Sequence, residues 1–193
     1  METDRKWVVV RIDGRIAAIS TDYAALAGIS ARLAMQKSPA YMKITAETVR
    51  FEQVWDIRMN ARWEDMALFG TEFQKKVWKR LFDLTHEEDG SQKAPSLISY
   101  SDFADLCQNK TGVRAVAHAI GLNPVAVVIP CHLVIPKESI DYLKGVREKA
   151  ESTIFKGDDI SMEKLLQEKG IDFGEYSLGR KLKRTLIQKE LSQ

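Results

Sequence analysis

Residues 99–136, with the sequence SYSDFADLCQNKTGVRAVAHAIGLNPVAVVIPCHLVIP, decide the predicted fold. Ser99 and Asp102 have the spacing of a helix-capping box, and a turn is expected at residues 109–112. Apolar residues recur at helical spacing on both sides of that turn, first at Phe103, Leu106 and Cys107, then at Val113, Val116, Ala117 and Ile120. This pattern predicts two helices joined by a short turn, which is typical both of a helix-turn-helix and of an ordinary helical hairpin.

The end of this stretch carries a candidate nucleophile. Residues 125–130, VAVVIP, are apolar and β-branched, so we predict a buried strand that leads directly into Cys131. The thiolate is the reactive form of cysteine, and His132 is a candidate base beside it. Because neighbouring side chains on an extended strand point to opposite faces, His132 would act on Cys131 through a water molecule. Taken alone, a buried cysteine next to a histidine is more often structural than catalytic.

Residues 1–68 predict a small mixed α/β N-terminal domain. In residues 6–20, KWVVVRIDGRIAAIS, two strands flank an Asp-Gly dipeptide, which readily adopts the positive φ that a tight hairpin turn needs. Residues 23–35, YAALAGISARLAM, are rich in alanine and leucine and favour a helix. Residues 47–59, ETVRFEQVWDIRM, have a more β-like composition.

Residues 69–193 predict a mostly α C-terminal domain. Its first helix is expected in residues 71–84, TEFQKKVWKRLFDL, with an apolar face at Phe73, Val77, Leu81 and Leu84. The polar residues 85–95 then predict an exposed loop without a periodic element. The fold class is therefore an α/β domain followed by a mostly α domain that contains the paired helices.

The remainder of this domain is charged and helical in pattern. A helix is expected at residues 161–169, SMEKLLQEK, ending at Gly170. The basic residues 180–193, RKLKRTLIQKELSQ, predict a last helix with Leu182 and Leu186 on its buried face. A lysine on such a helix, Lys183 for example, is ordinarily solvated.

Composition excludes several classes of protein. The chain has 193 residues, 45% of them hydrophobic, which is too apolar for a disordered protein. Two cysteines and three histidines build neither a disulfide framework nor a convincing zinc pattern, so we expect no metal and no cofactor. The start, METDRKWVVV, lacks the layout of a secretory signal, and we expect no membrane partner. A net charge of +2 permits nucleic-acid binding without indicating it.

Several linked motifs resemble the O6-alkylguanine-DNA alkyltransferase family. IPCHLV is preceded by GLNP, by VRAVAHAIG, by ISY and by TEFQKKVW, in that order and at compatible spacing. The resemblance runs from about Thr71 to Pro136 and resumes at YSLG, residues 176–179, and in the last helix as far as Glu190. It implies a winged-helix-like DNA-binding unit in which the two helices form a helix-turn-helix.

The resemblance implies a single, irreversible alkyl transfer from O6-alkylguanine in DNA, or from O4-alkylthymine, to Cys131. His132 would take the thiol proton through a bound water, and Glu190 would orient His132, in the manner of a catalytic triad. Asn123 matches the family asparagine that supports the cysteine through backbone hydrogen bonds. The thioether product is stable, so each molecule would act once.

The resemblance also implies how DNA is held. The target nucleotide must rotate out of the duplex. Arg114 would fill the gap that the base leaves, and Tyr100 would crowd the phosphate and help the rotation; outside this motif set the two would be ordinary surface and core-edge residues. Ala115 and Ala119 would allow close approach to a groove. The walls of the guanine pocket would be formed by Pro130, Val134, Tyr176, Ser177 and Gly179.

The chain departs from the family in three places. Leu133 stands where the family usually has an arginine that forms a structural ion pair, which affects local packing more than chemistry. The loop at residues 85–97 is longer than the family's short turn, and the segment at residues 137–172 is an insertion beside the expected pocket. The insertion bears on the size of substrate that the pocket accepts and on the approach of DNA.

Other functions fit parts of the pattern. A non-catalytic protein that recognises alkylated DNA would bind the lesion without accepting the alkyl group. A cysteine hydrolase using Cys131 and His132 would turn over repeatedly, and a helix-turn-helix regulator would select sequences in undamaged DNA. We expect a monomer that binds double-stranded DNA, in the cytoplasm at the nucleoid of a bacterium or in the nucleus of a eukaryote.

Overall fold

The computed structural model describes residues 5–21, 42–87, 89, 91–152 and 171–192. The helices expected at residues 23–35 and 161–169 lie outside these ranges. Contacts group the chain into two compact units that alternate along the sequence. The first unit contains residues 1–94 and 114–131, and the second contains residues 95–113 and 132–193. This grouping by contacts does not test a domain boundary after residue 68, which stays a prediction.

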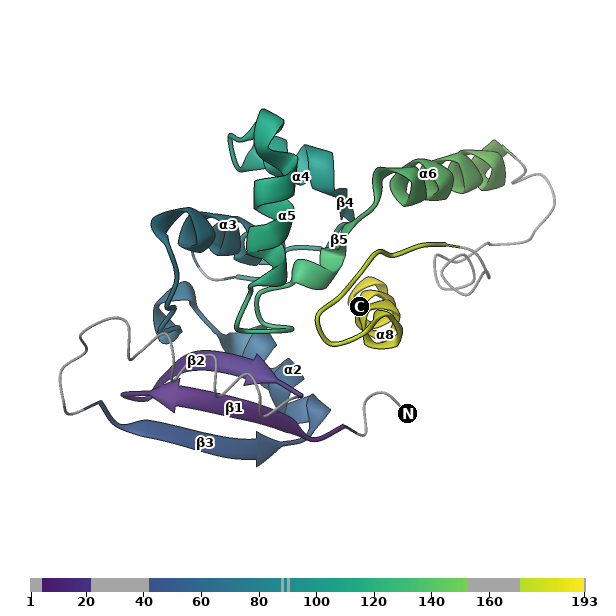
Figure 1. The fold of residues 1–193 in the computed structure, drawn as a ribbon. Helices are drawn as coiled ribbons and strands as arrows, with labels where there is room; N and C mark the ends of the chain where they lie inside the picture. The colour runs from purple at the N-terminus through teal and green to yellow at the C-terminus, as the bar shows by residue number, and fades with distance from the viewer. Residues whose placement is uncertain (1–4, 22–41, 88, 90, 153–170, 193) are drawn as a thin grey trace. The chain divides into compact units, whose positions relative to one another are not determined.

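The first unit contains a three-stranded antiparallel sheet. Strand β1 (Trp7–Ile12) lies between β2 (Arg15–Ser20) and β3 (Ile44–Val49), as Figure 1 shows. The turn between β1 and β2 has φ values of 49° at Asp13 and 80° at Gly14. Two successive positive φ values are the geometry of a tight hairpin turn, so the predicted hairpin is confirmed.

Helix α2 (Phe51–Asn60) corrects the prediction for residues 47–59. This segment is not uniformly β-like: β3 ends at Val49, and the helix begins two residues later. The aromatic residues of this segment lie on the buried face of the helix, where the ring of Phe51 lies 5.9 Å from both Trp7 and Trp55. Burial of this aromatic face outweighs β propensity, which is a weak determinant on its own.

Helix α3 (Glu72–Phe82) confirms the predicted first helix of residues 71–84, after a short 3-10 turn, η2 (Trp63–Asp65). Thr71 caps α3, because its side chain accepts the backbone N–H of Gln74 at 3.2 Å. The buried face differs in part from the prediction and consists of Val77, Trp78, Leu81 and Phe82. Phe73 was expected on this face and is instead 36% exposed.

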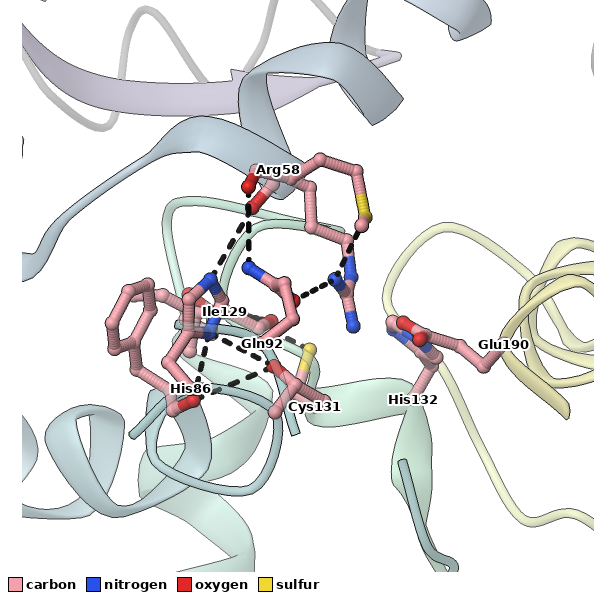
Figure 2. Close-up of polar contacts among 11 residues, drawn as sticks. Arg58, His86, Gln92, Ile129, Cys131, His132 and Glu190 are labelled. Carbon is pink, nitrogen blue, oxygen red and sulfur yellow. Dashed lines mark hydrogen bonds and ion pairs between the residues drawn. The ribbon is translucent and has the colours of Figure 1, made fainter. Parts of the chain in front are cut away.

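The start of the loop after α3 departs from the prediction of an exposed segment, because Thr85 and His86 are fully buried. The other described residues of this loop are exposed or half-buried, as predicted. The His86 ring stacks on Phe82 with centroids 3.8 Å apart, and its Nε2 lies 3.3 Å from the Arg58 carbonyl oxygen. Gln92 accepts a hydrogen bond from the Arg58 guanidinium at 3.2 Å, a contact drawn in Figure 2. A backbone carbonyl thus bonds the His86 ring and a side-chain amide bonds the Arg58 guanidinium, so the long loop is tied to the end of α2.

Most of the remaining short strands and helices lie in the second unit. Strands β4 (Ile98–Ser99) and β5 (Val134–Ile135) pair in parallel. The helices and 3-10 turns in this part of the chain are α4 (Tyr100–Leu106), η3 (Lys110–Gly112), α5 (Val113–Gly121), η4 (Cys131–Leu133), α6 (Lys137–Ser152) and α8 (Arg180–Leu191). Most of α5 belongs to the first unit. None of the helices in the described ranges is long and apolar enough to span a membrane.

Apolar residues that were predicted to be buried in two helices of this unit have different outcomes. Leu182 and Leu186 of α8 are fully buried, as predicted. Leu106 of α4 is 49% exposed and does not share the buried face of Phe103 and Cys107. Leu133 is fully buried.

Candidate active site

The segment that leads into Cys131 is a buried turn and not the predicted strand. Two backbone hydrogen bonds fasten it to β2, from Ile19 N–H to the Pro124 oxygen at 2.9 Å and from Ala126 N–H to the Ile19 oxygen at 3.1 Å. Val127 then takes a φ of 73°, which is strained for a β-branched residue. The run of apolar residues therefore indicates burial correctly but a strand wrongly.

Asn123 organises this turn around the cysteine. Its amide Nδ2 donates to the Ile129 carbonyl at 2.9 Å and to Cys131 Sγ at 3.1 Å, while its Oδ1 accepts the Val125 N–H at 3.0 Å. Cys131 is only 6% exposed. An N–H aimed at sulfur stabilises the negative charge of a thiolate, so the contact favours the nucleophilic form.

His132 and Glu190 form a buried pair in the second unit. Nε2 of His132 lies 2.9 Å from Oε1 of Glu190, and the two side chains are 0% and 1% exposed. Figure 2 shows the carboxylate facing the imidazole. The edge of the Tyr176 ring contacts His132, with centroids 6.5 Å apart and an interplanar angle of 86°. A carboxylate in this position fixes the ring orientation and stabilises an imidazolium.

Lys183 corrects the expectation of a solvated helix residue. It is fully buried on α8, and its Nζ donates to the carbonyl oxygens of Val134 at 2.8 Å and Glu175 at 3.3 Å. The same ammonium lies 5.8 Å from the centre of the Tyr100 ring, a cation–π distance. Lys183 thus joins residues from three separate parts of the sequence.

The candidate DNA-contacting residues have unequal exposure. Arg114 and Ala115 are exposed on α5, and Tyr100 is half-buried at the start of α4. Ala119 is 1% exposed, and its carbonyl accepts the Trp78 indole N–H at 2.8 Å. Ala119 lies on the packed face of α5, so its predicted approach to a DNA groove is wrong.

The predicted pocket residues also divide by exposure. Pro130 and Val134 are buried, Tyr176 is half-buried, and Ser177 and Gly179 are exposed. Close to them, Arg180 Nε donates to the Glu175 carboxylate at 2.9 Å, which holds the pKa of that carboxyl below its usual value. Glu175 therefore stays ionised on the surface of this unit.

Comparison with known proteins bears on this arrangement. Residues 72–153 match the model of the 6-O-methylguanine DNA methyltransferase DNA-binding domain. The resemblance to the O6-alkylguanine-DNA alkyltransferase family is confirmed. A probable methylated-DNA–protein-cysteine methyltransferase of Acanthamoeba polyphaga mimivirus is 41% identical over 75 residues, which cover 39% of this chain and 45% of the relative.

Two cellular methylated-DNA–protein-cysteine methyltransferases match a similar part of the chain. The enzyme of Kluyveromyces lactis is 47% identical over 68 residues, covering 35% of this chain and 32% of its own length. The inducible enzyme of Bacillus subtilis is 44% identical over 68 residues, covering 35% and 34%. The chain thus spans less than half the length of each of these relatives.

The fold likeness extends further than the sequence likeness. The crystal structure of an O6-methylguanine-DNA methyltransferase from Pyrococcus kodakaraensis superposes with a TM-score of 0.58 at 20% identity. The superposition covers 96% of this chain and 91% of that one. The mixed α/β fold of this chain is therefore that of the alkyltransferases.

Proposed function

We propose that this protein repairs DNA by moving an alkyl group from O6-alkylguanine to its own Cys131. The observation that carries the proposal is the buried Cys131 thiol with an Asn123 N–H donating to its sulfur at 3.1 Å. The next residue in the chain, His132, is held by a buried carboxylate at 2.9 Å. Nucleophile, base and orienting carboxylate are the three parts of a triad.

The proposed step is one displacement at carbon. The Cys131 proton passes through a water to the His132 imidazole, and Glu190 stabilises the imidazolium that forms. The thiolate attacks the alkyl carbon, so a C–S bond forms while the bond from carbon to O6 breaks and leaves its electron pair on the guanine oxygen. The guanine then regains a proton, and no leaving group remains by which water could release the thioether. One protein molecule repairs one lesion.

The DNA-binding part of the proposal concerns α4, η3 and α5. Together they would act as a helix-turn-helix within a C-terminal domain of residues 69–193, with α5 in the groove and Arg114 in the gap left by the flipped base. The exposed side chain of Arg114 and its neighbour Ala115 support this role. Tyr100 would press on the phosphate, and Tyr176, Ser177 and Gly179 would form a wall of the guanine pocket.

The first test is intact-mass spectrometry after mixing the protein with duplex DNA that contains O6-methylguanine. We expect one added methyl group, mapped to Cys131 and absent from Cys131→Ala. Tight binding to the damaged duplex without an adduct would instead support a recognition protein. Repeated turnover of an ester or amide would support a hydrolase.

A second test concerns Arg114. Arg114→Ala is expected to slow transfer from duplex DNA by about tenfold or more. Rotating the base out of the duplex costs a few kcal/mol, and without the arginine no side chain fills the gap that the base leaves. Transfer from the free base O6-methylguanine should be unchanged, since no extrusion is needed. Arg15→Ala, which removes another exposed arginine, is the matched control. Equal rates for Arg114→Ala and the parent protein on duplex DNA would contradict the role.

A further inference from the structure

The inserted segment at residues 137–172 is fastened where it begins and where it ends. Ser139, in the first turn of α6, donates through Oγ to the carbonyl oxygen of Asp172 at 2.6 Å. Ser139 is only 6% exposed, so water competes little for this hydrogen bond. The two ends of the insertion are therefore held together by a buried contact.

Two further contacts join the chain before the insertion to the chain after it. Gly174 has a φ of 77°, and a Cβ built there would lie 3.2 Å from Cδ of Pro136. The two segments thus approach more closely than most side chains permit. Lys183 bonds the carbonyl oxygens of Val134 and Glu175, one from each side of the insertion. The chain that enters the insertion and the chain that leaves it therefore lie against each other.

The beginning of the insertion shares a buried apolar cluster with the helix that carries Glu190. Ile140 and Leu143 of α6 share a buried apolar cluster with Ile187 of α8, and the other members of that cluster are Ile135, Ile171 and Phe173. Leu191 packs against the same cluster. Ile187 and Leu191 flank Glu190 on α8, so a change in the packing of this cluster would act on the turn of α8 that carries the carboxylate.

The contact between His132 and Glu190 tolerates little movement of α8. Its atoms are 2.9 Å apart, and a hydrogen bond is lost when such a distance passes about 3.5 Å. A shift of α8 by about 0.6 Å is therefore enough to break this hydrogen bond. Such a shift is less than half of the roughly 1.5 Å rise of one helical residue. Truncating a large side chain in the cluster leaves a cavity into which a helix can move by such an amount.

We propose that the start of the inserted segment positions Glu190 against His132, with Ser139, Ile140 and Leu143 as positioning residues. The inference rests on the proposed function for its effect on rate. The hydrogen bond between His132 and Glu190 can nevertheless be observed without any reaction. The start of the insertion then acts on the chemistry through α8.

The test compares Ile140→Ala with Ile12→Ala, because both remove the same atoms from a buried apolar cluster and Ile12 lies in the first unit. The ring protons of His132 are followed by NMR, and single-turnover methyl transfer is measured across pH where each variant is folded. We expect Ile140→Ala to shift the His132 resonances, slow transfer about tenfold and change the pH profile. Ser139→Ala should have the same effects at smaller size. Ile12→Ala should lower the melting temperature and leave the other readings unchanged.

Other outcomes are equally decisive. Unaltered His132 resonances in Ile140→Ala, or equal changes in Ile12→Ala, would overturn the proposal. If Ile140→Ala does not fold, Ile140→Val removes a single carbon and should shift the same resonances less. If the parent protein forms no methyl adduct, the proposed function fails, and the NMR comparison still decides whether the insertion positions Glu190.

Discussion

Replacing Asn123 with aspartate is expected to slow alkyl transfer by about 100-fold or more. The carboxylate keeps an oxygen for the Val125 N–H but loses the N–H groups that bond the Ile129 carbonyl and the Cys131 sulfur. A negative charge would face the thiolate that has to form. Loss of a hydrogen bond to a charged group costs about 1.5–3 kcal/mol, and each 1.36 kcal/mol is a factor of ten in rate.

The matched control for this change is Asn60→Asp. Asn60 also donates through Nδ2 to a carbonyl, that of Asp56 at 2.8 Å, but on the exposed side of α2. The two variants carry the same change in charge. Single-turnover transfer and the reactivity of Cys131 toward a thiol reagent, with Cys107 mapped separately, give the measurement. Similar transfer rates in both variants would show that Asn123 has no special role at the sulfur.

Replacing Glu190 with glutamine is expected to slow transfer by at least about 100-fold. The amide oxygen can still accept from the His132 ring, so the geometry is kept, but the negative charge that stabilises the imidazolium is lost. General-base catalysis contributes about 10²–10⁴-fold in typical enzymes, which sets the size of the effect. The pH profile of single-turnover transfer should change together with the rate.

Glu175→Gln provides the control for charge. Glu175 lies on the same unit and is ionised, but it is exposed and bonds Arg180 on the surface. Its replacement should leave the rate and the pH profile of transfer as they are. An unchanged pH profile in Glu190→Gln would remove Glu190 from the proposed mechanism.

Local sequence signals predicted those parts of the fold that local physics determines. The Asp13-Gly14 dipeptide predicts the hairpin because few other residues adopt two positive φ values in a row. The spacing of Val77 and Leu81 predicts the buried face of α3. The run at residues 125–130 predicted burial correctly but not the backbone conformation. Apolar β-branched residues indicate that a segment is buried, whereas the positive φ of Val127 belongs to the turn that Asn123 holds.

The residues that were predicted wrongly depend on distant parts of the chain. Lys183 is buried because the carbonyl oxygens of Val134 and Glu175 receive its ammonium, and no helical pattern contains those acceptors. Ala119 could have been placed correctly, since it follows Val116 by three residues and shares its buried face. Among the site residues, Cys131 and His132 were candidates from their own stretch of sequence, whereas Glu190 came only from the resemblance to the family.

The hydrogen bonds of the site differ in the length of chain that each must close during folding. Asn123 and Cys131 are 8 residues apart, whereas His132 and Glu190 are 58 residues apart. For a flexible unfolded chain the longer closure costs about 1.8 kcal/mol more in entropy. We therefore expect the thiol to acquire its amide donor early in folding and the imidazole to meet its carboxylate late. The protein would then become able to transfer the alkyl group only when folding is complete, because the contact between His132 and Glu190 is among the slowest to form.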